Sequence, residues 1–84
     1  MSRNFEECFS ELKETEESAA ECIHCLKKHG EQIYFDPDLK RIRMGRELYD
    51  PKYGHVMQTI SDLLKIKSLE DYQEKDREYN LTMY

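Results

Sequence analysis

The sequence predicts a mainly α protein, in which a long N-terminal helix packs antiparallel on a second helix. Three observations favour this fold class. Apolar residues recur at intervals of three and four over residues 4–30, and they do so again over residues 51–67. Strand-like alternation is confined to a short segment between them, about residues 32–44. A short C-terminal helix completes the predicted fold.

The first predicted helix extends from Asn4 to Gly30. Asn4 is a suitable N-cap, Glu7 lies three residues later as in a capping box, and Gly30 suits the left-handed position after the last turn. Glu16 interrupts the apolar row. The members of this apolar stripe are Phe5, Phe9, Leu12, Ala19, Ile23 and Leu26.

A small β-hairpin is predicted next, because residues 32–35 and 41–44 both alternate between apolar and polar side chains. Asp36 and Pro37 fit the first two positions of a type I turn between these segments. The alternative is an irregular crossover or a short helix capped by Asp36, with Pro37 in its first turn and Gly45 cutting it short.

Asp50 and Pro51 begin the second predicted helix as cap and first helical residue, and this helix extends to about Lys67. Its broad stripe is typical of a core-facing helix. Together, the stripes of the two long helices predict a core. Its members are Phe5, Phe9, Leu12, Ile23, Leu26, Val56, Met57, Ile60, Leu63 and Leu64.

Ser68 is a suitable cap for a third helix over residues 69–79. The apolar stripe of this segment is thin, with Leu69, Tyr72 and Tyr79 as its members. We therefore expect residues 68–84 to form a weakly docked arm of a single small helical domain that spans residues 1–84. The alternative is a continuation of the second helix without a break.

Composition narrows the classes of function. The chain has 84 residues and a net charge of −5, which disfavours direct binding to nucleic acid. It lacks the run of about 18 apolar residues that a membrane span needs. Its three cysteines are an odd number, and its N-terminus is polar, so we expect reduced thiols in a cytoplasmic protein.

The length of the first helix points to a partner. About 25 helical residues extend ~37 Å, whereas the second helix extends only ~25 Å and cannot cover the first from end to end. We therefore predict a non-enzymatic protein–protein interaction module, regulatory or adaptor in type, that binds a partner protein or forms a homodimer. The predicted partner-binding residues are Phe5, Phe9, Leu12, Glu16, Ile23 and Leu26.

The acidic N-terminal segment suggests an alternative function. Glu7, Glu14 and Glu17 lie on a predicted helix surface that is rich in carboxylates. Such a surface can imitate the phosphates of nucleic acid. The alternative is therefore a small acidic inhibitor that blocks a DNA- or RNA-handling enzyme, for example one encoded by a phage or mobile element.

No cofactor or catalytic residue is predicted, since no glycine-rich phosphate loop or nucleophile–base spacing is present. Cys22, Cys25 and His29 share a helix face, and Cys8 or His55 would be a fourth metal ligand. A single cysteine pair within a helix lacks the usual two-pair zinc pattern, so we expect apolar structural cysteines.

A basic cluster lies in the predicted hairpin region, and we expect it to form a solvated face. Its members are Lys40, Arg41, Arg43 and Arg46. One of the three arginines would pair with Glu16 if the hairpin folds back over the first helix.

Overall fold

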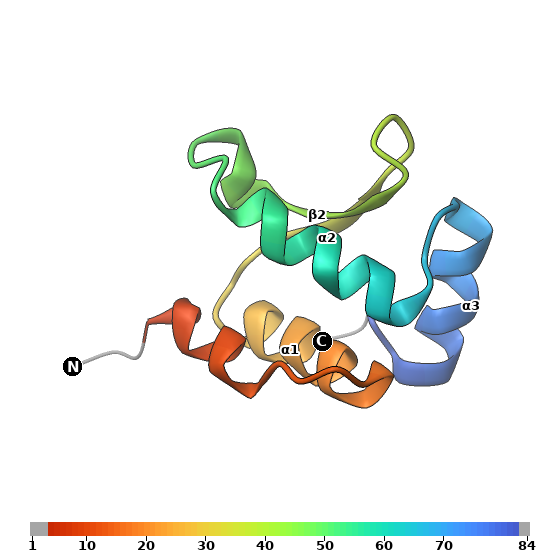
Figure 1. The fold of residues 1–84 in the computed structure, drawn as a ribbon, viewed down its shortest axis with the longest axis horizontal. Helices are drawn as coiled ribbons and strands as arrows, with labels where there is room; N and C mark the ends of the chain where they lie inside the picture. Colours follow the sequence, from red (N-terminus) through yellow and green to blue (C-terminus); the bar gives the residue numbers. More distant parts are fainter. Residues whose placement is uncertain (1–3, 83–84) are drawn as a thin grey trace.

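The computed structural model describes residues 4–82, in which helices pack on one face of a two-stranded antiparallel sheet (Figure 1). The mainly α class is therefore confirmed. In chain order the elements are the 3₁₀ helix η1 (Phe5–Glu11), the helix α1 (Glu16–Lys28), the strands β1 (Ile33–Asp36) and β2 (Arg41–Met44), the 3₁₀ helix η2 (Gly45–Leu48), and the helices α2 (Tyr53–Leu64) and α3 (Leu69–Tyr79).

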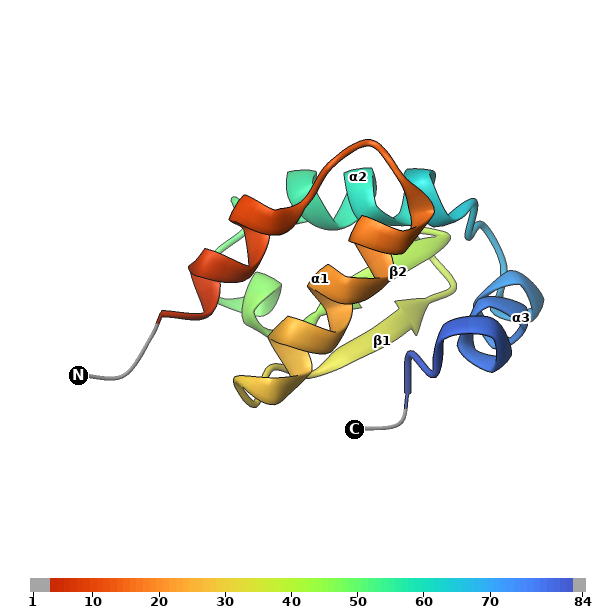
Figure 2. The same ribbon diagram turned by 90° about the horizontal axis from the view of Figure 1, so that it is seen from below.

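The single long N-terminal helix is not observed, because the chain breaks between η1 and α1. Thr15 caps α1, and its hydroxyl accepts a hydrogen bond from the backbone N–H of Ser18 at 3.1 Å. The buried Ser18 hydroxyl in turn accepts from the backbone N–H of Lys13 at 3.0 Å. These local bonds compete with a continuous helix, and η1 consequently folds back beside α1 (Figure 2).

The predicted β-hairpin is confirmed. β1 and β2 are antiparallel, with Ile33 opposite Met44 and Phe35 opposite Ile42. The Asp36 carboxylate accepts hydrogen bonds from the backbone of residues 38 and 39, which stabilises the turn. The expected N-cap at Asn4 and the positive φ of Gly30 (86°) are also present.

α2 is shorter at both ends than the predicted helix of residues 51–67. It ends where Lys65 adopts a left-handed conformation and the backbone N–H of Ile66 bonds back to Ser61. Ser68 caps α3, which is thus a separate helix. Tyr72 of α3 and the following Leu81 are both buried, so this segment contributes directly to the core.

The core lies where α2 packs against β2 on one side and α1 on the other (Figures 1 and 2). α1 and α2 run in opposite directions in Figure 1 and cross obliquely in Figure 2. The backbone N–H of Ile42 donates to the buried Ser61 hydroxyl at 2.8 Å, which fixes the hairpin to α2. Of the predicted core, five side chains are fully buried: Ile23, Leu26, Met57, Ile60 and Leu64.

The fold-back of η1 also removes the length mismatch from which a partner was inferred. The molecule measures 39 × 25 × 23 Å, and its α1 has 13 residues, close to the 12 residues of α2. The chain therefore covers its own first helix with η1, α2 and α3.

Candidate interaction site

The apolar residues predicted to bind a partner belong mostly to the core of the chain itself. Ile23 and Leu26 have no solvent exposure. Phe5, Phe9 and Leu12 are partly buried and pack against that core. The rings of Phe5 and Phe9 lie 5.4 and 6.1 Å from the ring of Tyr53, centre to centre. The predicted stripe is thus largely internal and presents no continuous apolar face.

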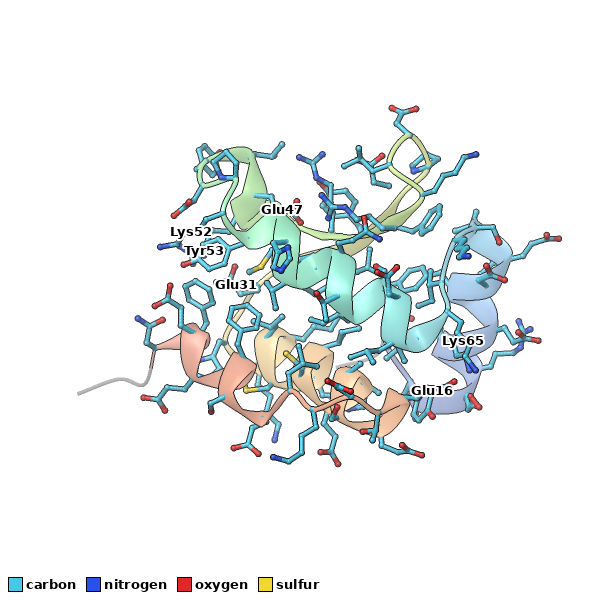
Figure 3. The ribbon with its side chains drawn as sticks, in the orientation of Figure 1. Glu16, Glu31, Glu47, Lys52, Tyr53 and Lys65 are labelled. Carbon is cyan, nitrogen blue, oxygen red and sulfur yellow. A yellow bond between two sulfur atoms is a disulfide. The ribbon has the colours of Figure 1, made fainter. Side chains whose placement is uncertain are left out.

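Glu16 faces α3 rather than a partner helix. Its carboxylate accepts a hydrogen bond from Lys75 at 2.9 Å and from the Tyr79 hydroxyl at 3.1 Å, with Lys65 at 3.8 Å (Figure 3). The bond from Lys75 is the main cause that lowers the pKa of Glu16 below its ordinary value. The arginines of the hairpin region therefore do not pair with Glu16.

Among residues 4–82, two of the four large apolar side chains that remain exposed are adjacent, at the end of η2. Leu48 is 65% exposed and the adjacent Tyr49 is 88% exposed, and we call these two residues the exposed corner. An open hollow of about 510 Å³ lies beside them and is lined partly by Gly30, Gln32 and Gly45. Sequence reasoning missed this surface, because both residues sit between charged neighbours and outside any periodic stripe.

A buried cluster of charged side chains around Glu47 lies next to the exposed corner in the sequence and holds its backbone in place. The Glu47 side chain is only 3% exposed and accepts hydrogen bonds from Arg41 at 3.0 and 3.2 Å (Figure 3). It also accepts from Arg43 at 3.4 Å and from the backbone N–H of Met44 at 3.0 Å. A buried carboxylate needs such partners to offset its lost hydration, so this cluster fixes the course of η2.

A second pair lies at the edge of the hollow. Arg46 binds Glu31 through two hydrogen bonds of 2.6 and 3.2 Å, and its guanidinium lies 4.2 Å from the centre of the Phe5 ring. Arg43 also pairs with Asp36 at 3.0 Å. The predicted solvated basic face is therefore wrong for Arg41 and Arg43, which are ion-paired and largely shielded from solvent, whereas Arg46 and Lys40 are exposed.

The acidic residues of the N-terminal segment are at the surface. Glu7, Glu14 and Glu17 are all exposed, as are Glu11 and Glu21. In the described part of the chain, four of these five carboxylates form no ion pair. These four are Glu11, Glu14, Glu17 and Glu21.

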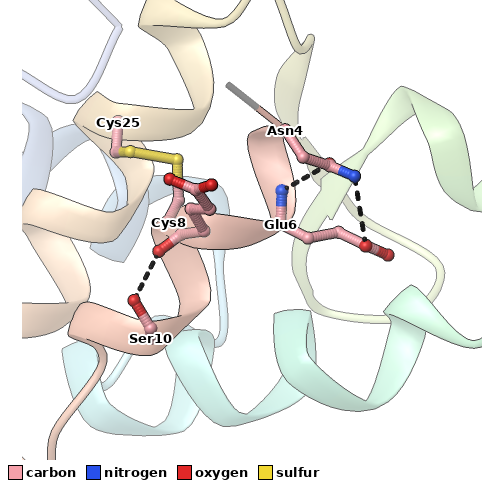
Figure 4. The surroundings of a disulfide bond; sticks show 6 residues. Asn4, Glu6, Cys8, Ser10 and Cys25 are labelled. Carbon is pink, nitrogen blue, oxygen red and sulfur yellow. Dashed lines mark hydrogen bonds between the residues drawn. A yellow bond between two sulfur atoms is a disulfide. The ribbon is translucent and has the colours of Figure 1, made fainter. Parts of the chain in front are cut away.

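The expectation of three reduced thiols is wrong, because Cys8 and Cys25 form a disulfide (Figure 4). The fold-back of η1 brings Cys8 to Cys25, a contact that a continuous helix would forbid. The disulfide also removes the cysteine count as an argument for a reducing compartment.

The three candidate metal ligands Cys22, Cys25 and His29 are not brought together. Cys22 lies in the core, and burial raises the pKa of its thiol to about 12. Cys25 and His29 instead lie beside Cys8. His24 has a structural role, since its Nε2 donates to the carbonyl of Tyr79 at 2.7 Å.

Comparisons with known protein families, curated proteins and solved structures find no match. No helix among residues 4–82 is long and apolar enough to cross a membrane. The interpretation of the exposed corner and of the acidic surface therefore depends on their geometry and charge.

Replacing Glu47 with glutamine should lower the free energy of unfolding by about 3 kcal/mol, because Arg41 and Arg43 lose their buried counter-charge. Urea denaturation followed by circular dichroism measures this loss. The matched control is Glu21→Gln, an exposed acid, which should change stability by less than about 0.5 kcal/mol. Equal effects of the two substitutions would contradict the structural role of the Glu47 cluster.

Glu16 should make stability depend on pH in the acid range. Because its pKa is lowered in the folded state, its contribution is complete above the ordinary glutamate pKa of about 4.3 and is lost as pH falls through the lowered value. Glu16→Gln should therefore flatten the curve of unfolding free energy against pH below about pH 5. The control Glu17→Gln should keep the wild-type curve, and a flattened curve in both variants would refute this assignment.

Proposed function

We propose that the chain is a non-enzymatic protein–protein interaction module that self-associates through the exposed corner. The adjacent exposure of Leu48 and Tyr49 is the single observation that carries this proposal. Tyrosine and arginine are common anchors of protein interfaces, and Arg46 lies at the edge of the same hollow. Within the described residues, the two other exposed large apolar side chains are those of Leu39, in the hairpin turn, and Leu69, at the start of α3.

The backbone of the exposed corner is already ordered in the free chain, and this order favours its use as a binding surface. Association is weakened when loops must be ordered on binding. Here the Glu47 cluster already orders the backbone that carries Leu48 and Tyr49. The Arg46–Glu31 pair holds the opposite side of the hollow in the same way. The corner is thus preorganised, so burial of its apolar surface is not offset by a large loss of chain entropy.

The shape of the corner fits a second copy of the same chain. A two-fold symmetric interface requires one surface to carry both a projection and a recess, since each copy presents the same patch. Tyr49 projects beside the hollow that it lines. The flanking charges are balanced by the pairs Arg46–Glu31 and Lys52–Asp50, so they do not oppose self-association. The small patch predicts a weak dimer of micromolar affinity.

Analytical ultracentrifugation from low micromolar to millimolar concentration tests the dimer. The wild-type chain should pass from monomer to dimer, and Tyr49→Ser should remain monomeric with an unchanged circular dichroism spectrum. Leu69→Ser is the matched control, because it removes a 54% exposed apolar side chain from another part of the surface. A monomeric wild-type chain across the whole range would overturn the proposal, as would equal loss of dimer in both variants.

The exposed acids favour a second candidate function, that of an inhibitor that imitates nucleic acid. Its support is the group of carboxylates on η1, on α1 and between them. Because Glu11, Glu14, Glu17 and Glu21 form no ion pair with any residue between 4 and 82, their negative potential is not cancelled locally. Such a surface attracts the basic channel of a nucleic-acid-processing enzyme, and the attraction weakens as salt rises.

Inhibition assays with a set of nucleases and polymerases test this second candidate at low and high salt. The chain should inhibit at least one enzyme at low salt, and lysine at positions 7, 14 and 17 should abolish that inhibition. The matched control places lysine at positions 38, 70 and 74, which are exposed acids elsewhere, and should still inhibit. Inhibition that survives the first triple variant would exclude the acidic surface, and so would the absence of any inhibition.

A further inference from the structure

Cys8, Cys25 and His29 form a cluster that neither the proposed dimer nor the proposed nucleic-acid mimicry uses. Their sulfur atoms and a ring nitrogen of His29 all lie within 4.8 Å of one another. Cys8 is fully buried, Cys25 is half-buried, and His29 is exposed. The cluster therefore reaches from the interior to solvent at one end of α1.

Two features of the fold bring these three side chains together. Cys25 and His29 are four residues apart, which places them on the same side at the end of α1, where His29 is the C-cap. Cys8 comes from η1, which folds back along that helix. Cys22 belongs to the core instead, so the cluster uses only two of the three cysteines.

We propose that the reduced form of this cluster binds a zinc ion through Cys8, Cys25 and His29. Two cysteines and one histidine, with a fourth position left to water, are an established zinc ligand set. Zinc bonds of about 2.3 Å to sulfur and 2.0 Å to nitrogen separate tetrahedral ligand atoms by about 3.6–3.8 Å. Reduction of the disulfide frees the two sulfur atoms to separate to this spacing, and a ring nitrogen of His29 already lies within 4.8 Å of both. The exposed side of His29 leaves room for water.

The site requires a redox step before it can bind metal. A dithiol reductant transfers two electrons and two protons to the Cys8–Cys25 disulfide, which becomes two thiols while the reductant becomes a disulfide. Zinc then displaces one proton from each thiol, so two thiolates balance the charge of the ion. The carbonyl end of α1 adds a favourable potential for a cation. The disulfide and the metal site are thus alternative states of the same pair of cysteines.

A small movement of Cys8 accommodates the change between these states. η1 is a 3₁₀ helix of seven residues, longer than the three or four residues usual for this weaker helix type. Cys25 and His29, by contrast, are held by α1, whose carbonyl at Cys25 accepts the backbone N–H of His29 at 3.2 Å. Two ligands are therefore fixed and the third adjusts.

Cobalt(II) is the probe for this site, because thiolate ligation gives it charge-transfer absorption that zinc lacks. The full chain is reduced with a phosphine, desalted without oxygen and titrated with cobalt. We expect one equivalent to bind with thiolate charge-transfer bands, and zinc to displace it. The disulfide form should show no such bands. Reduced chain without these bands would overturn the proposal.

Substitutions distinguish cobalt binding at this site from cobalt binding by the cysteines of an unfolded chain. Cys25→Ser should abolish the charge-transfer bands, and His29→Gln should weaken cobalt binding by about tenfold or more. Cys22→Ala and His55→Gln are the matched controls and should bind as the wild type does. Equal effects of the two histidine substitutions, or loss of the bands in Cys22→Ala, would refute the assignment. Circular dichroism of each cobalt-bound variant checks that the helices are retained.

Discussion

The buried carboxylate of Glu47 is the constraint on which the arrangement of the hairpin, η2 and α2 depends. It binds Arg41 and Arg43 of β2 and the backbone N–H of Met44, the last residue of that strand before η2. The first turn of α2 closes over the same ions, since a Cβ at Gly54 would lie 3.3 Å from both Arg41 and Glu47. Losing any one partner would leave charge without hydration, so the three elements are held in one geometry.

Local signals accounted for much of the fold. The Asp36 turn, the Ser68 cap and the positive φ of Gly30 are each determined by neighbouring residues, so the sequence predicts them. The prediction of one long first helix was wrong, although local signals also determine the break. Its apolar spacing continues across the break, because η1 and α1 face one core, whereas the Thr15 and Ser18 hydroxyls end the helix between them.

The candidate sites depend on contacts that sequence spacing does not reveal. Cys8 meets Cys25 only because η1 turns back, and no local pattern gives the direction of that turn. At the exposed corner the usual rule of burial is reversed, since charged Glu47 is inside and apolar Leu48 and Tyr49 are outside. From residue type alone, Glu47 would be expected at the surface and Leu48 and Tyr49 in the interior. The distribution of acids was simpler to predict, as most charged side chains stay in water.

The bonds between α1 and the end of the described chain affect how this protein folds during synthesis. His24 bonds to the backbone at residues 79 and 80, and Glu16 bonds to Lys75 and Tyr79, so these contacts span 55 to 63 residues. Contacts between distant residues form slowly. α1 is synthesised before α3, and its surface is not fully covered until α3 has formed and packed against it. The growing chain therefore exposes part of the α1 surface until α3 and residue 80 have been synthesised.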